Sequence, residues 1–475
     1  MIAFNKTKIV ATIGPASSSK EILQQLIQTG VDVCRLNLSH GDYAEHKAIL
    51  DHIREINKEL GTHAAILVDL QGPKLRIGEV NNNEVFLDVG KEIELSTIES
   101  IGNAARLFIN YKQFPQDVEI GDHVLIDDGK IQLVVTATNR VDTVKAVIAS
   151  GGKLSSRKGV NLPKTKISLP SLTEKDLADL EFALEQNVDW IGLSFVRKAT
   201  DIIELKKIIA SKKKNVRVIA KIEKPEAIAE IDQIINETDA LMVARGDLGV
   251  ELPMEEVPLI QKMLVRKCIQ AGKPVIIATQ MMESMINNYT PTRAEVNDVA
   301  NSVLDGADAV MLSGETSVGK YPVKVVENMQ MIISNVERKG FLFNRDHKPD
   351  ATSPTYISDS VCYNACVMAS QVDAKAIVGI TRSGYTAYKV SSQRPQASIF
   401  IFTDIPEMLN VLSLVWGVRG FYYDKSVSTD ETISELQQIL KEKGQLQKGD
   451  IVINLASVPL SEQSRTNMIK LGIVS

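Results

Sequence analysis

Two short apolar runs in this sequence end in charged side chains whose types suit the binding of a divalent cation and an anion. Residues 218–223 end in Lys221 and Glu223, and residues 241–249 carry Asp247. Each run has the length and β-branching of a buried parallel strand, and in α/β folds ligands bind beyond the carboxyl ends of such strands. Two carboxylates and an ammonium at that edge are suited to a divalent cation that holds an anionic substrate. A buried salt bridge between Lys221 and a neighbouring carboxylate is the alternative interpretation.

The same pattern, an apolar run that ends in polar residues, recurs six more times. These runs span residues 8–14, 33–39, 64–69, 190–196, 274–280 and 309–315. Helical patterns lie between most of them, with capping residues such as Thr173 at their starts and glycines such as Gly61 at their ends. Eight strands that alternate with helices predict an α/β fold, a (β/α)8 TIM barrel with its active site on the C-terminal face. An open, doubly wound sheet is the alternative topology.

The composition is that of a soluble enzyme. A chain of 475 residues is too long for one core, so two or three domains are expected. The formal charge of −5 gives no reason to expect nucleic acid or an anionic membrane as a partner. We find no signal peptide and no apolar run long enough to span a bilayer, so we expect a cytoplasmic protein. The four cysteines lack zinc-site spacing, and Cys362 and Cys366 are expected to be small core residues on one helix face.

One stretch breaks the alternation of strands and helices. Residues 73–170 carry several strand patterns separated by turn signals, and they predict a small all-β domain, a small β-barrel, inserted between the third strand and its helix. Pro73 and Pro170 flank the insert, so it is expected to act as a lid over the barrel mouth. A rigid surface appendage is the alternative. The catalytic barrel is then expected to comprise residues 1–72 and 171–338.

Residues 339–475 are expected to form a separate α/β domain with a regulatory or oligomerisation role. It begins with a linker-like stretch, and four apolar runs follow, at residues 376–380, 398–402, 418–423 and 451–455. Between its first strand and a helix lie Thr381, Arg382, Ser383, Gly384, Tyr385 and Thr386. Hydroxyls, a guanidinium and a glycine at a helix N-terminus suit a phosphate. A plain strand-to-helix turn is the alternative.

A series of longer motifs, in order along the chain, resembles pyruvate kinases. The motifs occupy residues 8–15, 35–41, 158–163, 220–223, 244–249, 278–285, 291–295 and 311–316. The resemblance spans the barrel, the insert and the C-terminal domain. It implies a glycolytic phosphotransferase that moves phosphate from phosphoenolpyruvate to ADP, giving pyruvate and ATP, with protonation of the enolate as the last step. It also implies a homotetramer.

The resemblance assigns chemical roles to the polar residues at the strand ends. Lys221 and Arg35 would neutralise the transferring phosphoryl group, and Arg76 would assist them. Glu223 and Asp247 would hold Mg²⁺, or Mn²⁺ in its place. The remaining assignments are substrate contacts at Gly246, Asp247 and Thr279, proton delivery by Thr279 with Ser313, and nucleotide contacts at Pro15, Asn37, His40 and Lys158.

One motif departs from the commoner pattern of the family. After the third strand that pattern reads Asp-Thr-Lys-Gly-Pro-Glu-Ile-Arg, and a bound K⁺ assists the phosphoryl group. Here residues 69–76 read Asp-Leu-Gln-Gly-Pro-Lys-Leu-Arg, so Lys74 replaces a glutamate. The expected K⁺ position lies beside Asn37, Ser39, Asp69 and Leu70. Lys74 would supply the missing positive charge, and the chain resembles the subgroup that works without K⁺. A solvated hinge residue is the alternative role for Lys74.

The effector and the reaction class leave further alternatives open. Family members activated by fructose-1,6-bisphosphate carry a loop similar to residues 381–386 and a glycine-rich loop near the C-terminus. Residues 457–464 contain no glycine, so a phosphorylated effector other than fructose-1,6-bisphosphate is expected. A Mg²⁺-dependent lyase or aldolase acting on pyruvate enolate would use the same Lys, Glu and Asp. A non-enzymatic sensor of phosphorylated metabolites would need only the C-terminal loop.

Overall fold

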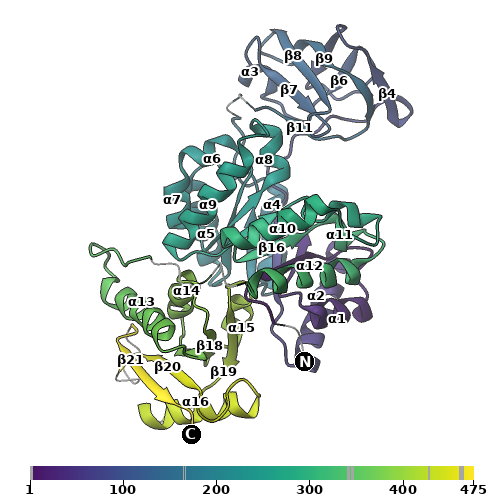
Figure 1. Ribbon diagram of the computed structural model, residues 1–475. Coiled ribbons are helices and arrows are strands. Elements are labelled where there is room, and N and C mark those ends of the chain that lie inside the picture. Colours follow the sequence, from purple (N-terminus) through teal and green to yellow (C-terminus); the bar gives the residue numbers. More distant parts are fainter. Residues whose placement is uncertain are drawn as a thin grey trace.

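The computed structural model describes residues 4–163, 165, 167–339, 343, 347–425, 428–458 and 465–475, and its largest sheet is a closed barrel of parallel strands (Figure 1). The eight strands are β1 (Lys8–Thr12), β2 (Val33–Asn37), β3 (Ala65–Asp69), β12 (Trp190–Leu193), β13 (Arg217–Ile222), β14 (Ala240–Ala244), β15 (Val275–Ala278) and β16 (Ala309–Leu312). Their order around the barrel is β1-β16-β15-β14-β13-β12-β3-β2. The predicted (β/α)8 barrel is confirmed, and the open sheet is wrong.

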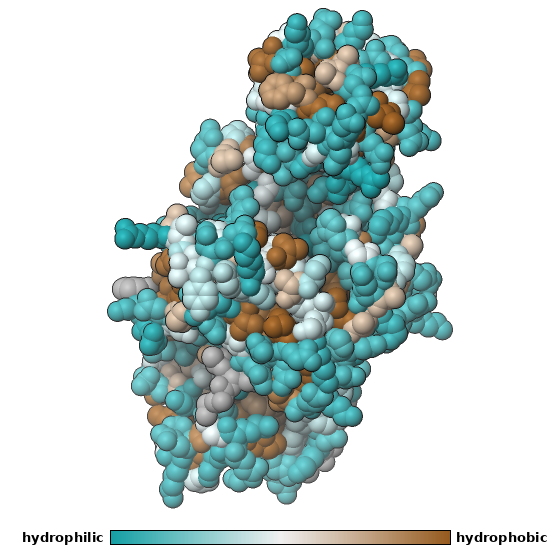
Figure 2. Space-filling view, turned by 90° about the vertical axis from the view of Figure 1, so that its right-hand side faces the viewer, coloured by the Kyte–Doolittle hydropathy of each residue, from teal (hydrophilic) through white to brown (hydrophobic). Residues whose placement is uncertain are grey.

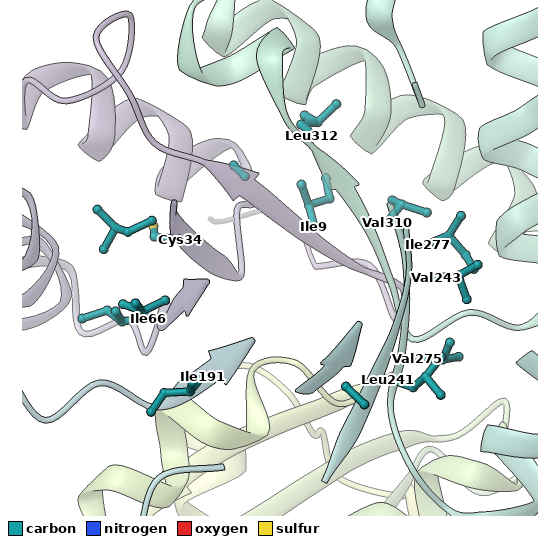
Figure 3. Close-up of a cluster of buried hydrophobic side chains, with 14 of the residues drawn as sticks. Ile9, Cys34, Ile66, Ile191, Leu241, Val243, Val275, Ile277, Val310 and Leu312 are labelled. Atoms are coloured by element: carbon teal, nitrogen blue, oxygen red, sulfur yellow. The ribbon is translucent and has the colours of Figure 1, made fainter. Parts of the chain in front are cut away.

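The barrel strands are buried on both faces, as strands of a parallel barrel must be. Ile9, Cys34, Ile66 and Ile191 belong to the hydrophobic layer between the strands and the surrounding helices, and Figure 3 shows these side chains on the outer face of the barrel. The alternate residues belong to a second cluster, which continues into the C-terminal domain; they include Val10, Val33, Leu67, Trp190, Ile219, Met242, Ile276 and Met311. This packing fixes the strand ends, where the polar residues begin.

The helices around the barrel begin and end close to the predicted signals. They include α1 (Lys20–Thr29), α2 (Tyr43–Leu60), α4 (Glu174–Glu185), α5 (Ala199–Ser211), α6 (Pro225–Ala229), α7 (Ile231–Glu237), α9 (Val257–Ala271), α10 (Arg293–Asp305) and α12 (Pro322–Glu337). Thr173 and Thr292 form capping boxes, and Gly61 and Gly272 end helices in the left-handed conformation. Three short elements follow barrel strands at the C-terminal face: α8 (Arg245–Glu251), η2 (Glu283–Ile286) and α11 (Gly314–Ser317).

The insert between β3 and α4 is an all-β unit with its own core. Its six-stranded curled sheet has the order β11-β7-β8-β9-β5-β6, and a two-stranded ribbon pairs β10 with β4. The strands are β4 (Glu84–Leu87), β5 (Glu92–Ser96), β6 (Arg106–Phe108), β7 (His123–Ile126), β8 (Ile131–Thr138), β9 (Thr143–Ser150), β10 (Gly152–Ser155) and β11 (Val160–Asn161), with a short helix α3 (Phe114–Asp117) and a 3₁₀ turn η1 (Asn81–Asn83). Figure 2 shows the insert as a lobe above the barrel, joined through a narrower waist.

The C-terminal part is a five-stranded sheet flanked by helices. Its strands are β17 (Ala376–Ile380), β18 (Ser398–Thr403), β19 (Val418–Tyr422), β20 (Ile451–Ala456) and β21 (Met468–Ile473), and its helices are α13 (Tyr356–Gln371), α14 (Tyr385–Ser392), α15 (Pro406–Leu412) and α16 (Thr429–Glu442). The four predicted strands are present, whereas β21, antiparallel to β20, was not predicted. Cys362 and Cys366 are buried on α13, as expected. Among the described residues, none of the helices has the length and apolar character needed to cross a bilayer.

Candidate active site

Lys221 lies at the centre of a buried polar network at the C-terminal end of the barrel. Its ammonium lies 2.9 Å from Oε1 of Glu223 and 3.2 Å from Oδ2 of Asp69. It also donates a hydrogen bond of 2.7 Å to Oγ of Ser194. The alternative of a buried salt bridge therefore describes the contacts of Lys221 correctly, but the bridge stands at the barrel mouth, where a (β/α)8 barrel carries its chemistry.

Charge pairing in this network overcomes the cost of burial. Burial alone would lower the pKa of the Lys221 ammonium, but the charges of Asp69 and Glu223 outweigh it and raise that pKa. Burial also opposes ionisation of Asp69, yet the charges of Arg35 and Lys221 hold the pKa of this carboxyl below its usual range. The site therefore presents a fixed ammonium and a fixed guanidinium at neutral pH, which suits an anion with developing charge.

Asp69 orients both cations. Nε and Nη2 of Arg35 donate to Oδ2 of Asp69 over 2.9 and 2.7 Å, and Nη1 donates to Oγ1 of Thr12. Oδ1 of Asp69 is buried and has no hydrogen-bond partner in the described part of the chain. Gly192, its partner across β3 and β12, leaves room for this atom, because a Cβ at Gly192 would lie 2.2 Å from Oδ1. The carboxylate is therefore held in one position by both cations and by the adjacent strand.

Gly192→Ala is expected to reduce turnover about tenfold, roughly 1.4 kcal/mol of barrier. The added methyl group must displace the Asp69 carboxylate, and the ion pairs to Arg35 and Lys221 must shift with it. Steady-state turnover at saturating substrate measures the effect. Gly379→Ala is the matched control, since Gly379 is also a strand glycine but its Cβ would meet only side chains, at 3.3 Å or more. Equal activity of the two variants would show that the Asp69 position is unimportant.

Glu223 and Asp247 fit a hard divalent cation. Burial and the nearby charge of Asp247 raise the pKa of Glu223, against the opposing charge of Lys221, and a cation between the carboxylates would relieve this repulsion. Oε2 of Glu223 accepts a 2.7 Å hydrogen bond from the backbone N–H of Phe195, a residue with φ of 54°. Among the described residues no group of three or more His, Cys, Asp or Glu could hold a metal. Two carboxylates with open positions are the protein ligand set typical of Mg²⁺.

Thr279 and Ser313 follow β15 and β16 at the same end of the barrel. Thr279 has φ of 69°, a strained conformation for a β-branched residue. Its Oγ1 donates to the carbonyl of Ala278 over 2.6 Å and accepts from the backbone N–H of Gly246 over 2.8 Å. The backbone of Ser313 donates to Glu315, a carboxyl whose pKa is raised by burial. The Thr279 hydroxyl and the Gly246 amide, both predicted as substrate contacts, therefore already bond to each other.

A cavity of about 920 Å³ brings together three of the four predicted nucleotide contacts. Pro15, Asn37 and His40 line it together with Arg35 and Ser313. Lys158 does not, because it lies on the insert and its ammonium pairs with Oδ1 of Asp127 at 2.8 Å. Arg76 is likewise bonded within the hinge region, to the carbonyl of Arg157. Any contact of Lys158 with a nucleotide in this cavity requires the insert to move.

The residues predicted to lie beside a monovalent cation form hydrogen bonds and ion pairs with other groups of the protein. Oδ1 of Asn37 accepts from the N–H of Ser39, the carbonyl of Leu70 accepts from Oγ of Ser194, and Asp69 binds the two cations described above. Lys74 lies close to this region, since its charge contributes, after burial and Arg76, to lowering the pKa of His40.

The C-terminal loop lies between β17 and α14, as predicted, but several of its groups have internal partners. The N–H of Gly384, at φ of 83°, donates to Oγ1 of Thr381. Arg382 pairs with Asp404 at 3.1 Å, and the Tyr385 hydroxyl bonds to Asp359. Thr386 and Ser383 complete the loop; Thr386 is buried against Thr466, and the carbonyl of Ser383 accepts from Arg217 at the start of β13. Residues 459–464 of the second loop considered above lie outside the described residues.

Two residues of the network were not predicted from the sequence. Ser194 bonds to Lys221 and to Leu70, and Thr12 bonds to Arg35 and to the carbonyl of Leu312. Both are hydroxyl residues at or just beyond the end of an apolar run, which is the signal that could have identified them.

Comparison with known proteins agrees with this geometry. The family model "Pyruvate kinase, barrel domain" matches residues 4–326, and "Pyruvate kinase, alpha/beta domain" matches residues 359–471. A pyruvate kinase of Geobacillus stearothermophilus is 43% identical over 474 residues, 99% of this chain and 80% of the relative. One of Mycobacterium intracellulare is 42% identical over 97% of both chains.

The fold is also that of a solved relative. A crystal structure of a pyruvate kinase from Cryptosporidium parvum superposes with a TM-score of 0.92 at 34% identity, covering 99% of this chain and 96% of the other. The match extends over the barrel and the C-terminal α/β sheet. The chain therefore belongs to the pyruvate kinase family, the phosphotransferases that convert phosphoenolpyruvate and ADP into pyruvate and ATP.

Proposed function

We propose that the network around Lys221 is the phosphoryl-transfer site of this pyruvate kinase. The observation that carries the proposal is the buried arrangement of Lys221, Arg35 and Asp69, which fixes two cations at the barrel mouth. Phosphoryl transfer needs positioning and positive charge around the moving group rather than a covalent nucleophile. Lys221 and Arg35 neutralise the phosphoryl oxygens, with Arg76 as a further cation near the hinge.

Glu223 and Asp247 hold Mg²⁺ in this proposal, and Mn²⁺ is an acceptable substitute. A cation held there would act as a Lewis acid and balance the negative charge on the substrate oxygens. The backbone at Gly246 and Asp247 orients the substrate carboxylate. Because the Gly246 N–H donates to Thr279, substrate binding exchanges that bond for one to the substrate and frees a lone pair of the Thr279 hydroxyl, whose own proton stays bonded to the carbonyl of Ala278.

Thr279, supported by Ser313, then handles the proton that converts enolpyruvate into pyruvate. The freed lone pair of the Thr279 hydroxyl can accept from a water molecule, and this water passes a proton taken from solvent to the methylene carbon. The hydrogen bond from the Gly246 amide holds the Thr279 hydroxyl beside that amide before substrate binds. Transfer of the phosphoryl group and delivery of the proton thus use opposite sides of the substrate: the Lys221 side and the Thr279 side.

ADP is proposed to occupy the cavity lined by Pro15, Asn37 and His40. Lys158 joins these contacts when the insert, residues 73–170, swings over the barrel mouth as a lid. The catalytic unit is then residues 1–72 and 171–338, and residues 339–475 form the regulatory and oligomerising unit. The proposed assembly is a cytoplasmic homotetramer, and its mass in solution is the direct measurement.

A coupled pyruvate assay tests the proposal. With Mg²⁺, phosphoenolpyruvate and ADP, pyruvate and ATP should form in equal amounts, and omission of ADP should stop the formation of both. A Mg²⁺-dependent lyase acting on the same enolate would release pyruvate without ADP, and a sensor would release none. Either result would contradict the proposed reaction.

A phosphorylated effector is proposed to bind at Thr381, Arg382, Ser383, Gly384, Tyr385 and Thr386. The guanidinium of Arg382 is half-exposed and would exchange Asp404 for a phosphate. AMP or a sugar phosphate other than fructose-1,6-bisphosphate should change the affinity for phosphoenolpyruvate on the order of fivefold, and Arg382→Ala should remove the response. A screen in which no phosphorylated compound alters substrate affinity would eliminate the effector site.

A further inference from the structure

One side chain of the insert, Asn161, bonds to a buried ion pair of the barrel, while near the hinge Arg197 of the barrel donates to the carbonyls of Ile167 and Leu169. Nδ2 of Asn161, in β11, donates a 2.8 Å hydrogen bond to Oε1 of Glu251, the last residue of α8. The same oxygen accepts from Nζ of Lys224 at 2.6 Å. Figure 1 shows β11 at the lower edge of the insert, close to α8. Gly129, in the β7–β8 turn, also lies close to the barrel, because a Cβ added there would lie 3.9 Å from the side chain of Val250.

This contact joins the insert to the two segments that carry the proposed metal ligands. Lys224 follows Glu223 directly, and α8 begins with residues that include Asp247 and ends with Glu251. Lys224 and Glu251 are both more than nine-tenths buried. The ion pair between them is therefore part of the barrel, whereas Asn161 is the partner that can leave with the insert.

The contact lies on the far side of the barrel mouth from the cavity proposed for ADP. That cavity is lined from β1, β2 and α11, while α8 follows β14, which is four strands from β2 in either direction around the closed barrel. Lys158 is three residues from Asn161 and pairs with Asp127 rather than reaching the cavity. For Lys158 to reach a nucleotide, the insert must move toward β1 and β2 and away from α8.

The contact is also incomplete. Oε2 of Glu251 is buried and has no hydrogen-bond partner among the described residues, and a buried carboxylate oxygen without a partner is costly. Only about 30 Å³ of space remains between the hinge, Asn161, Lys224 and Asp247, enough for no more than one or two waters. A contact of one good hydrogen bond beside an unsatisfied oxygen can be made and broken at modest cost.

From this juxtaposition we infer that Asn161 is a positioning residue that latches the insert to Glu251 in an open orientation, so that nucleotide binding must break the Asn161–Glu251 bond. The inference rests on the proposed closure of the insert over ADP. In this inference the Lys224–Glu251 pair is the preformed site in the barrel to which the Asn161 side chain bonds. Loss of the latch makes closure easier and favours the nucleotide-bound state.

Asn161→Ala should therefore tighten Mg²⁺–ADP binding roughly three- to tenfold, the net value of one ordinary hydrogen bond, and leave the affinity for phosphoenolpyruvate unchanged. Asn161→Asp should act in the same direction, because its carboxylate would face that of Glu251. Asn81→Ala, on an exposed part of the insert, is the control. Substitution of Glu251 is avoided because it would leave Lys224 buried without a partner.

The position of the insert is measured directly by pulsed electron–electron resonance between nitroxides on Ala48→Cys and Lys145→Cys. Both side chains are exposed, one on α2 and one on β9, and the four native cysteines are buried. Labelled subunits are diluted with unlabelled ones so that only distances within a chain contribute. The distance should shorten with Mg²⁺–ADP in the parent chain, and should already be shifted toward the short value in Asn161→Ala without nucleotide.

Two results would overturn the latch, and they separate its failure from that of the lid. If the parent chain closes on Mg²⁺–ADP but Asn161→Ala shows the same distances and the same ADP affinity, the latch is wrong and the lid stands. If the parent chain shows no change of distance with nucleotide, the closure on which the latch depends is wrong.

Discussion

Lys221→Met is expected to abolish phosphoryl transfer while leaving the fold intact, with turnover reduced on the order of a thousandfold, about 4 kcal/mol of barrier. Methionine keeps most of the side-chain volume but removes the ammonium that lies between Asp69 and Glu223. The transferring group then loses its central positive charge, while Arg35 and the further cation Arg76 remain. Turnover at saturating phosphoenolpyruvate and ADP measures the loss.

Two further measurements assign that loss to chemistry rather than to folding. Lys8→Met removes another buried ammonium, which pairs with Asp32 at the N-terminal end of β1, away from the barrel mouth. This variant should have a lower thermal midpoint, but the folded enzyme should keep its turnover. Proton exchange at the methyl group of pyruvate should survive better in Lys221→Met, since it depends on the Thr279 side. Turnover close to that of the parent chain, with unchanged substrate binding, would remove Lys221 from the mechanism.

The barrel could be predicted because its strands carry strong local signals. Each of the eight runs is mainly apolar, and polar residues gather toward its end, so the strands and the ligand-binding face follow from the same pattern. The strands that were not predicted lack this signal. β6 has three residues, and β21, at the edge of its sheet, mixes Lys470 and Gly472 with exposed apolar side chains.

The partners within the site could not be predicted from spacing. The motif predicts that Asp69 lies beside a monovalent cation. In the structure its carboxylate instead binds Arg35, 34 positions earlier in the sequence, and Lys221, on a strand that follows the insert. Only barrel closure brings these residues together. Lys158 illustrates the opposite case: its motif predicts a nucleotide contact, yet its position depends on how the insert is oriented, which sequence patterns do not encode.

The largest remaining effect is expected for the charge at Lys74. In the proposed mechanism its ammonium supplies the positive charge that K⁺ brings in the commoner pattern of the family, so the enzyme should require Mg²⁺ but not K⁺. Lys74 is close enough to affect the pKa of His40, together with Arg76 and Arg35. Lys74 and the Arg35 guanidinium thus both act on His40, and the charge of Lys74 needs no binding equilibrium to be present.

Lys74→Glu reverses this charge and is expected to reduce K⁺-free turnover roughly thirtyfold, about 2 kcal/mol for two charge units at ~10 Å in a partly screened site. Added K⁺ should restore much of the loss in the variant and change the parent chain little. Turnover is measured at constant ionic strength, with K⁺ exchanged for a bulky tetraalkylammonium ion, and Lys145→Glu on the exposed face of β9 is the matched charge reversal. The K⁺-free turnover of Lys74→Gln should lie between that of the parent chain and that of Lys74→Glu, because this substitution removes one charge unit rather than two. More than about tenfold stimulation of the parent chain by K⁺, or 1.4 kcal/mol of barrier, would show that Lys74 is a hinge residue and that the monovalent ion acts beside it.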